Sequence, residues 1–145
     1  MENRKQQIIV AKPRKKDEEF FNRIKQDYST EAENVILELL NNGKLLTTSK
    51  IRNILSLINE VGEKIVFEQE NLDKHIEDDI LYIKVKLAYL YGRSTKEDKS
   101  VEQFIDKSKL IELVMCIGNS KEKFKQFAKY VEALVAYHKY YGGKD

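Results

Sequence analysis

The run His75-Ile76-Glu77-Asp78-Asp79 contains side chains that can bind a metal ion or transfer a proton. On a helix, His75 shares a face with Asp78 and Asp79, which follow at three and four residues. An imidazole and carboxylates in this arrangement can hold a divalent cation, so a metal-dependent hydrolase built on His75 and Asp79 is one hypothesis. Carboxylates in a first helical turn are also favoured by the helix dipole alone. We therefore expect a helix start here rather than a metal site.

Two further side chains with catalytic potential are expected to be structural. Cys116 lies between Met115 and Ile117, a setting that favours a small core residue over a nucleophile. His138 follows Val131 on the expected inner stripe of the last helix, so we expect it to be hydrogen-bonded and semi-buried. The sequence has neither a Walker sequence nor a Gly-rich phosphate loop. We predict that the chain is not an enzyme, with no catalytic residue, no cofactor and no metal.

Aromatic and basic side chains alternate along one helical stripe, at Tyr82, Lys86, Tyr89 and Arg93. Their spacing keeps them on one face, distinct from the apolar face of the same segment. The cations can pair with phosphates while the tyrosine rings pack on sugars or bases. The same stripe also suits tyrosines at the rim of a core beside solvated cations, so this pattern alone leaves both readings open.

The helix that opens after Thr47-Thr48-Ser49 is a second candidate for anion binding. Its hydroxyls and free amides are followed by Lys50, Arg52 and Asn53 in about the first turn. Such a helix start suits a phosphate, although an ordinary N-cap has the same sequence. The last helix carries a third basic row, which is usually only a solvated face and consists of Lys121, Lys125 and Lys129.

Apolar periodicity predicts an all-α fold, because no alternating strand pattern of useful length occurs. We expect a compact bundle of about five main helices, preceded by a short helix that includes Phe20, Phe21 and Ile24. The main helices are one ending at Asn41-Asn42-Gly43, one opening at Thr47-Thr48-Ser49, one from about Asp73 to Tyr91, one from Val101 to Gly118-Asn119, and one from Ser120 to Tyr141.

Charge is distributed unevenly, although the net charge of the 145 residues is only +2. Residues 1–16 carry six basic side chains and one acidic, whereas residues 60–79 carry two basic and eight acidic. Residues 120–145 are basic again, with six basic and three acidic side chains. Binding surfaces respond to the local electrostatic potential, so the small net charge does not exclude a polyanionic partner.

Length and composition set the broad class of the protein. We expect residues 1–18 to be a flexible basic N-terminal arm and residues 19–145 to be a single helical domain. No apolar run approaches the ~20 residues that span a bilayer, so we expect no membrane association. The start lacks an apolar signal core, and the lone Cys116 cannot form a disulfide within one chain. We therefore expect a cytoplasmic protein.

Three segments, in this order and spacing, carry a resemblance to a known family. They are LTTSKIRNIL (Leu46 to Leu55), KVKLAYLYGR (Lys84 to Arg93) and FAKYVEALVAYHKYYGGK (Phe127 to Lys144). Together they resemble the small subunit of the type III-A CRISPR effector, the Csm complex. The resemblance extends from about Leu45 to Lys144 and leaves the N-terminal arm uncovered.

The resemblance implies a small helical, non-catalytic subunit of an RNA-guided antiviral complex. Several copies would stack along the duplex of guide and target RNA, beside the backbone subunit and in contact with the large subunit. The matching segments imply that RNA is contacted by Lys50, Arg52, Lys86, Tyr89, Arg93 and Lys129. These cations would neutralise backbone phosphates, while base pairing with the guide reads the sequence.

A helix-turn-helix regulator that binds DNA is the alternative. Residues Thr47 to Leu57 would then form the end of the turn and the recognition helix. The connection from Asn41 to Leu46 is longer than the usual turn of about three to four residues, which counts against this alternative.

Overall fold

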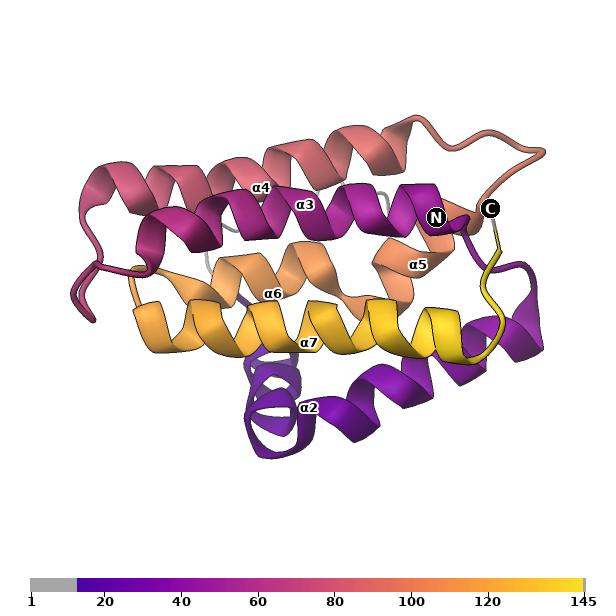
Figure 1. Cartoon of the computed structure of the whole chain (residues 1–145), viewed down its shortest axis with the longest axis horizontal. Coiled ribbons are helices and arrows are strands. Elements are labelled where there is room, and N and C mark those ends of the chain that lie inside the picture. Colours follow the sequence, from indigo (N-terminus) through magenta and orange to yellow (C-terminus); the bar gives the residue numbers. More distant parts are fainter. Residues whose placement is uncertain (1–12, 145) are drawn as a thin grey trace.

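Helices account for most of the described chain, residues 13–144, in the computed structural model (Figure 1). They are α2 (Lys15–Asn42), α3 (Thr48–Ile65), α4 (Lys74–Gly92), α5 (Ser100–Ser108), α6 (Leu110–Ile117) and α7 (Lys121–Tyr140). Within this range, β-type pairing is limited to an isolated bridge between Asn71 and Ser120. The predicted all-α fold is confirmed. Residues 1–12 of the expected arm lie outside the described residues, and α2 begins at Lys15.

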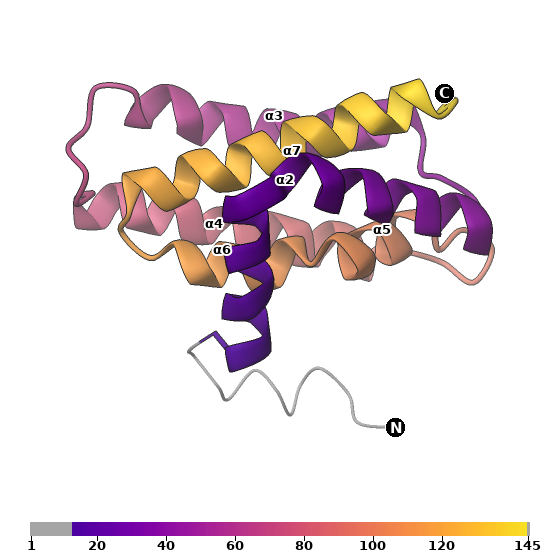
Figure 2. The same cartoon turned by 90° about the horizontal axis from the view of Figure 1, so that it is seen from below.

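α2 consists of two helical runs that meet at Asp27, where the backbone leaves helical geometry with φ −157° and ψ 73°. The Asp27 carboxylate accepts a hydrogen bond from the Thr30 amide at 3.1 Å and so caps the second run. The first run buries Phe20, Phe21 and Ile24. This is the short leading helix that the sequence predicts, and it crosses the long axis of the bundle (Figure 2).

The expected helix from Val101 to Gly118 is divided at Lys109, so the prediction of one continuous helix there is wrong. Lys109 has left-handed backbone angles, with φ 59° and ψ 32°. The Ser108 hydroxyl bonds back to the Phe104 carbonyl at 2.6 Å, and the Ser108 carbonyl accepts from the Tyr130 hydroxyl at 2.8 Å. The described chain therefore has six helices, because the expected fourth one is divided in two and the expected leading helix is joined to the next one as α2.

Side-chain caps begin two of the helices where the sequence predicts them. Thr47 Oγ1 accepts from the Lys50 amide at 3.3 Å, and Ser120 Oγ accepts from the Lys123 amide at 3.1 Å. α4 starts directly after Asp73 and ends at Gly92, within one residue of the predicted bounds. None of the helices over residues 13–144 is both long and apolar enough to cross a membrane.

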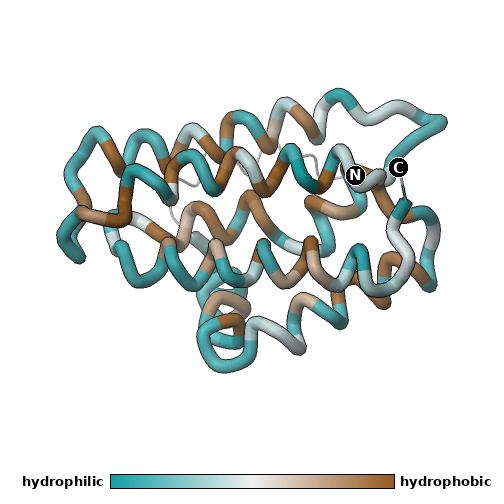
Figure 3. Tube along the Cα trace, in the orientation of Figure 1, coloured by the Kyte–Doolittle hydropathy of each residue, from teal (hydrophilic) through white to brown (hydrophobic). Residues whose placement is uncertain are grey.

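α7 occupies the centre of the bundle and packs against α2, α3 and α6. Its inward side chains Phe124, Phe127 and Tyr130 are fully buried, and the Phe20 ring meets Tyr130 edge to face at 6.0 Å between centroids. α3 and α4 run next to each other along the long axis of the bundle (Figure 1). On each of them apolar residues recur at the spacing of the helical turn (Figure 3). The core thus holds α3 and α4 side by side.

The C-terminal residues fasten the start of α3. The carbonyl of Lys144 accepts from the Thr48 amide at 3.1 Å. His138 Nε2 lies 2.7 Å from the Leu46 carbonyl, and the Gly143 amide donates to the His138 carbonyl at 2.8 Å. His138 is only 1% exposed, so the expected hydrogen bond is present and the side chain is more buried than predicted.

Candidate nucleic-acid interface

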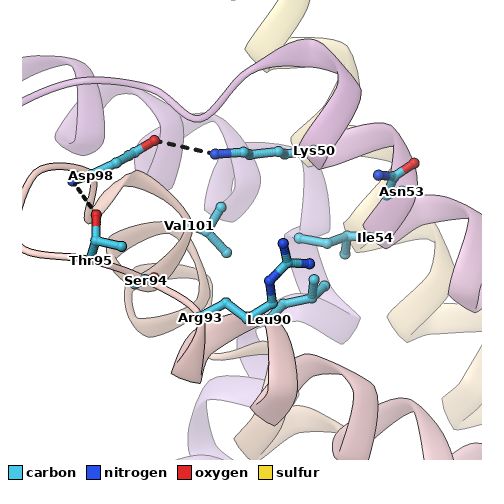
Figure 4. A pocket seen from close by; sticks show the side chains of 9 residues that line it. All are labelled: Lys50, Asn53, Ile54, Leu90, Arg93, Ser94, Thr95, Asp98 and Val101. Atoms are coloured by element: carbon cyan, nitrogen blue, oxygen red, sulfur yellow. Dashed lines mark hydrogen bonds and ion pairs between the residues drawn. The ribbon is translucent and has the colours of Figure 1, made fainter.

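A hollow of about 440 Å³ lies between α3, α4 and the connection from α4 to α5 (Figure 4). We call it the α3–α4 hollow, and it is lined by Lys50, Asn53, Ile54, Leu90, Arg93, Ser94, Thr95, Asp98 and Val101. It unites Lys50 and Arg93, two of the predicted RNA-binding cations, although they belong to separate segments of the sequence. The packing of α3 on α4 brings them together.

Lys50 is held across the hollow by Asp98, whose carboxylate lies 3.2 Å from its ammonium (Figure 4). The other carboxylate oxygen of Asp98 accepts from the Ser100 hydroxyl at 2.6 Å and from the Ser100 amide at 3.0 Å. These Ser100 hydrogen bonds and the Lys50 ammonium hold the pKa of Asp98 well below its usual range. Asp98 is therefore ionised and already partnered.

The aromatic and basic stripe of α4 forms as predicted and lies on the outer face of the helix. The Lys86 ammonium is 5.0 Å from the centre of the Tyr82 ring, and the Arg93 guanidinium is 5.7 Å from that of Tyr89. Tyr82 is 57% exposed and Tyr89 is 66% exposed. The tyrosines are thus surface groups rather than rim-of-core residues, available to a partner.

The remaining predicted cations lie apart from the α3–α4 hollow. Arg52 is exposed on α3, one residue before Asn53 on the rim. Lys129 is exposed on α7, where it lines a separate groove against α3 with Lys125. In the same row Lys121 is structural, because its ammonium caps α3 through the carbonyls of Val66 at 3.0 Å and Glu68 at 2.8 Å.

Residues of the α3–α4 hollow that were not predicted as site residues are Ile54, Leu90, Ser94, Thr95, Asp98 and Val101. The connection that carries Ser94 and Asp98 is recognisable in the sequence only as polar. An Asp can form an Asx turn by accepting from the amide two residues later, and here Asp98 bonds the Ser100 amide. Its second role, as the partner of Lys50, depends on a tertiary contact that no local pattern contains.

The residues of the metal hypothesis have other partners. Asp78 pairs with Lys74 at 3.3 Å, and Asp79 pairs with Lys64 at 3.2 Å. Among residues 13–144, no group of three or more His, Cys, Asp or Glu side chains is placed to hold a metal ion.

Cys116 is buried, as predicted. Burial, followed by the nearby carboxylates of Asp17 and Glu18, raises the pKa of its thiol to about 11. At neutral pH the side chain is therefore a protonated thiol, which is a poor nucleophile.

The helices flanking residues 43–47 do not form the arrangement of a helix-turn-helix. α3 packs against α7 and α4, and α2 packs against α7, α6 and α5. A helix-turn-helix needs its two helices braced against each other. The fold gives this alternative no support.

Comparison with known proteins identifies the family of the chain. Residues 22–144 match the family model described as Csm2 Type III-A. The chain is 37% identical over 123 residues to the CRISPR system Cms protein Csm2 of Streptococcus thermophilus, covering 83% of this chain and 95% of that protein. The corresponding protein of Mycobacterium tuberculosis is 33% identical over 124 residues, covering 84% of this chain and 97% of that protein.

A further relative matches over a shorter range. The CRISPR system Cms protein Csm2 of Enterococcus italicus is 43% identical over 100 residues, covering 66% of this chain and 68% of that protein. The family match begins at residue 22, so it includes most of α2 as well as the three segments that carry the resemblance. The chain belongs to the Csm2 family, the small subunit of the type III-A CRISPR Csm complex.

Proposed function

We propose that this chain is a non-catalytic scaffold subunit that stacks in several copies along the duplex of guide and target RNA. Its exposed cations neutralise backbone phosphates, and base pairing between guide and target reads the sequence. The contacting residues are Lys50, Arg52, Lys86, Tyr89, Arg93 and Lys129. In the complex, further copies of the chain and the backbone and large subunits are its protein partners.

The observation that carries this proposal is the meeting of Lys50 and Arg93 at the α3–α4 hollow. Two of the three segments that carry the resemblance supply one cation each to the same concave surface. The stripe on α4 extends this surface with a further cation and two exposed rings. Phosphate pairing by cations beside aromatic packing suits an RNA strand held through its backbone and sugars.

The proposal is tested by the double substitution Arg52→Ala and Arg93→Ala. Both side chains are exposed, so the helical fold is expected to persist. RNA affinity should fall for every sequence, and the slope of log K against log salt should decrease by about one per lost phosphate contact. Titration of a guide–target duplex at several salt concentrations measures both quantities, and target cutting by the assembled complex gives a second measurement.

The matched control is Arg23→Ala with Lys25→Ala, which removes two exposed charges from α2. This variant should lose less affinity than the test variant and keep the salt slope. Undiminished RNA affinity in the Arg52 and Arg93 variant, or an equal loss in the control, would count against the proposal.

A further inference from the structure

We propose that the α3–α4 hollow receives one unpaired nucleobase of a bound RNA strand. This inference rests on the proposed function, because the phosphates on either side of the base are those held by Lys50 and Arg93. It adds a new element to that function: a base-binding site within a surface otherwise expected to contact only the RNA backbone.

The size and floor of the α3–α4 hollow suit a planar aromatic ligand. Its volume of about 440 Å³ lies within the range of about 300–1,000 Å³ that is usual for small-molecule sites. Its apolar lining comes from Ile54, Leu90 and Val101, one residue from each of three helices. An apolar floor gives a phosphate no hydrogen bonds to replace those that it makes with water. The face of a base makes few hydrogen bonds with water, so it moves onto this floor at little cost in free energy.

Arg93 provides the opposite wall. Its guanidinium projects over the hollow toward Ile54 and Lys50 (Figure 4). Guanidinium planes stack on unpaired bases in RNA complexes, and the cation contributes a phosphate contact as well. Contact with the Tyr89 ring at 5.7 Å restrains this side chain before any ligand binds.

Polar groups at the rim match the edge of a base. The Asn53 amide, which is both a donor and an acceptor, lies on the α3 side. On the opposite side the Ser94 hydroxyl is buried and has no hydrogen-bond partner within the described chain. Because the oxygen itself is covered, a base gains this hydrogen bond only when the Ser94 side chain rotates toward the hollow.

Asp98 does not oppose an anionic strand at this site. One carboxylate oxygen is bonded to Ser100 and the other to Lys50. The charge of Asp98 is therefore compensated, and its effect is to hold the Lys50 ammonium at the mouth of the hollow, where a phosphate next to the inserted base would lie.

The experiment compares two single strands of equal length, oligoadenylate and a strand of abasic ribose phosphates, on the purified full chain. We expect oligoadenylate to bind about 5- to 150-fold more tightly, which is the range for stacking one base. In Val101→Phe, which fills the hollow without changing any charge, this ratio should fall toward one while the affinity for the abasic strand stays the same. Val66→Phe is the control, since Val66 is an exposed valine at the other end of α3.

A second measurement uses the unmodified chain and does not depend on the folding of the Val101→Phe variant. A strand carrying one 4-thiouridine should cross-link on irradiation to residues 90–101 or 50–54. Cross-links confined to Tyr82 or Tyr89 would overturn the inference, as would equal affinity for the two strands or an unchanged ratio in folded Val101→Phe. Equal, salt-dependent binding of both strands would overturn the base site alone, whereas no binding of either strand or of a guide–target duplex would overturn the proposed function with it.

Discussion

At the scale of single residues, the structure separates charges that are committed to the fold from charges that are free to bind. Lys121 is used to cap α3, whereas Lys50 is tethered only to Asp98 at the surface. An exposed ion pair of this kind contributes at most about 1 kcal/mol to stability. Because the pKa of Asp98 is lowered, its carboxylate keeps its charge above about pH 4, and the tether on Lys50 persists at neutral pH.

Cys116 gives the clearest dependence on pH. We expect the thiol of the folded chain to react negligibly with a disulfide reagent at pH 8, and to react rapidly once the chain is unfolded. The physical reason is that burial raises its pKa to about 11, whereas the unfolded value is about 8.5. Timed labelling with and without denaturant measures the difference. Rapid labelling of the native chain at pH 8 would show that the thiol is not protected.

The same pKa shift predicts how stability changes with pH. The folded chain holds the thiol proton more tightly than the unfolded chain does, so this contribution to the free energy of unfolding is complete below about pH 8.5. It is lost as the pH rises from there toward about 11. The Cys116→Ala variant lacks this contribution, so its stability should fall less steeply over that interval than that of the unmodified chain.

At the scale of the elements, helix positions follow from the sequence where the cause is local. The apolar stripe of α4, the Thr47 and Ser120 caps and the end at Gly92 all depend on neighbouring residues. The break at Lys109 does not, because Tyr130 of another helix bonds the Ser108 carbonyl there. For the same reason the basic residues of the candidate interface can be proposed from the sequence, whereas the meeting of Lys50 and Arg93 at the α3–α4 hollow cannot.

The contact between the C-terminal tail and α7 predicts a specific destabilisation. A Cβ atom added at Gly143 would overlap the His138 ring, so Gly143→Ala should lower the free energy of unfolding by about 1–3 kcal/mol. In a His138→Ala background, which removes the ring, the same substitution should cost less. Urea unfolding of the four proteins in this cycle measures the coupling.

Gly92→Ala is the matched control, since a Cβ at Gly92 meets nothing within 4 Å. It should leave stability unchanged or raise it slightly. If Gly143→Ala were equally costly with and without the His138 ring, the packing explanation would be wrong.

At the scale of the whole molecule, the uneven charge suits the proposed role of a subunit that binds both RNA and its own copies. Head-to-tail stacking pairs two different surfaces, which favours opposite charges on them. We propose that the acidic residues 60–79 form one of these surfaces; the start of α7 lies beside them, with Ser120 bonded to Glu70, so the complementary basic surface lies elsewhere on the chain. The ion pairs of Asp78 and Asp79 lie within the chain and are exposed, so they compete only weakly with a neighbouring copy.

Reversing the charges of Glu77, Asp78 and Asp79 should therefore reduce the number of copies in the assembled complex. Native mass spectrometry of the purified complex measures that stoichiometry. The control reverses three exposed carboxylates of α2: Glu18, Glu19 and Glu38. Unchanged stoichiometry in the test variant would remove the electrostatic basis for stacking through this region.

The central place of α7 has a consequence for how the protein is made. Synthesis proceeds from the N-terminus, so α2, α3 and α6 leave the ribosome before the helix against which all three pack. A chain that stops before Phe124 cannot bury Phe20 against Tyr130 or cover the inner face of α3. Prematurely terminated products would therefore expose apolar surface and be recognised by proteases. Only finished subunits would then persist to enter the Csm complex.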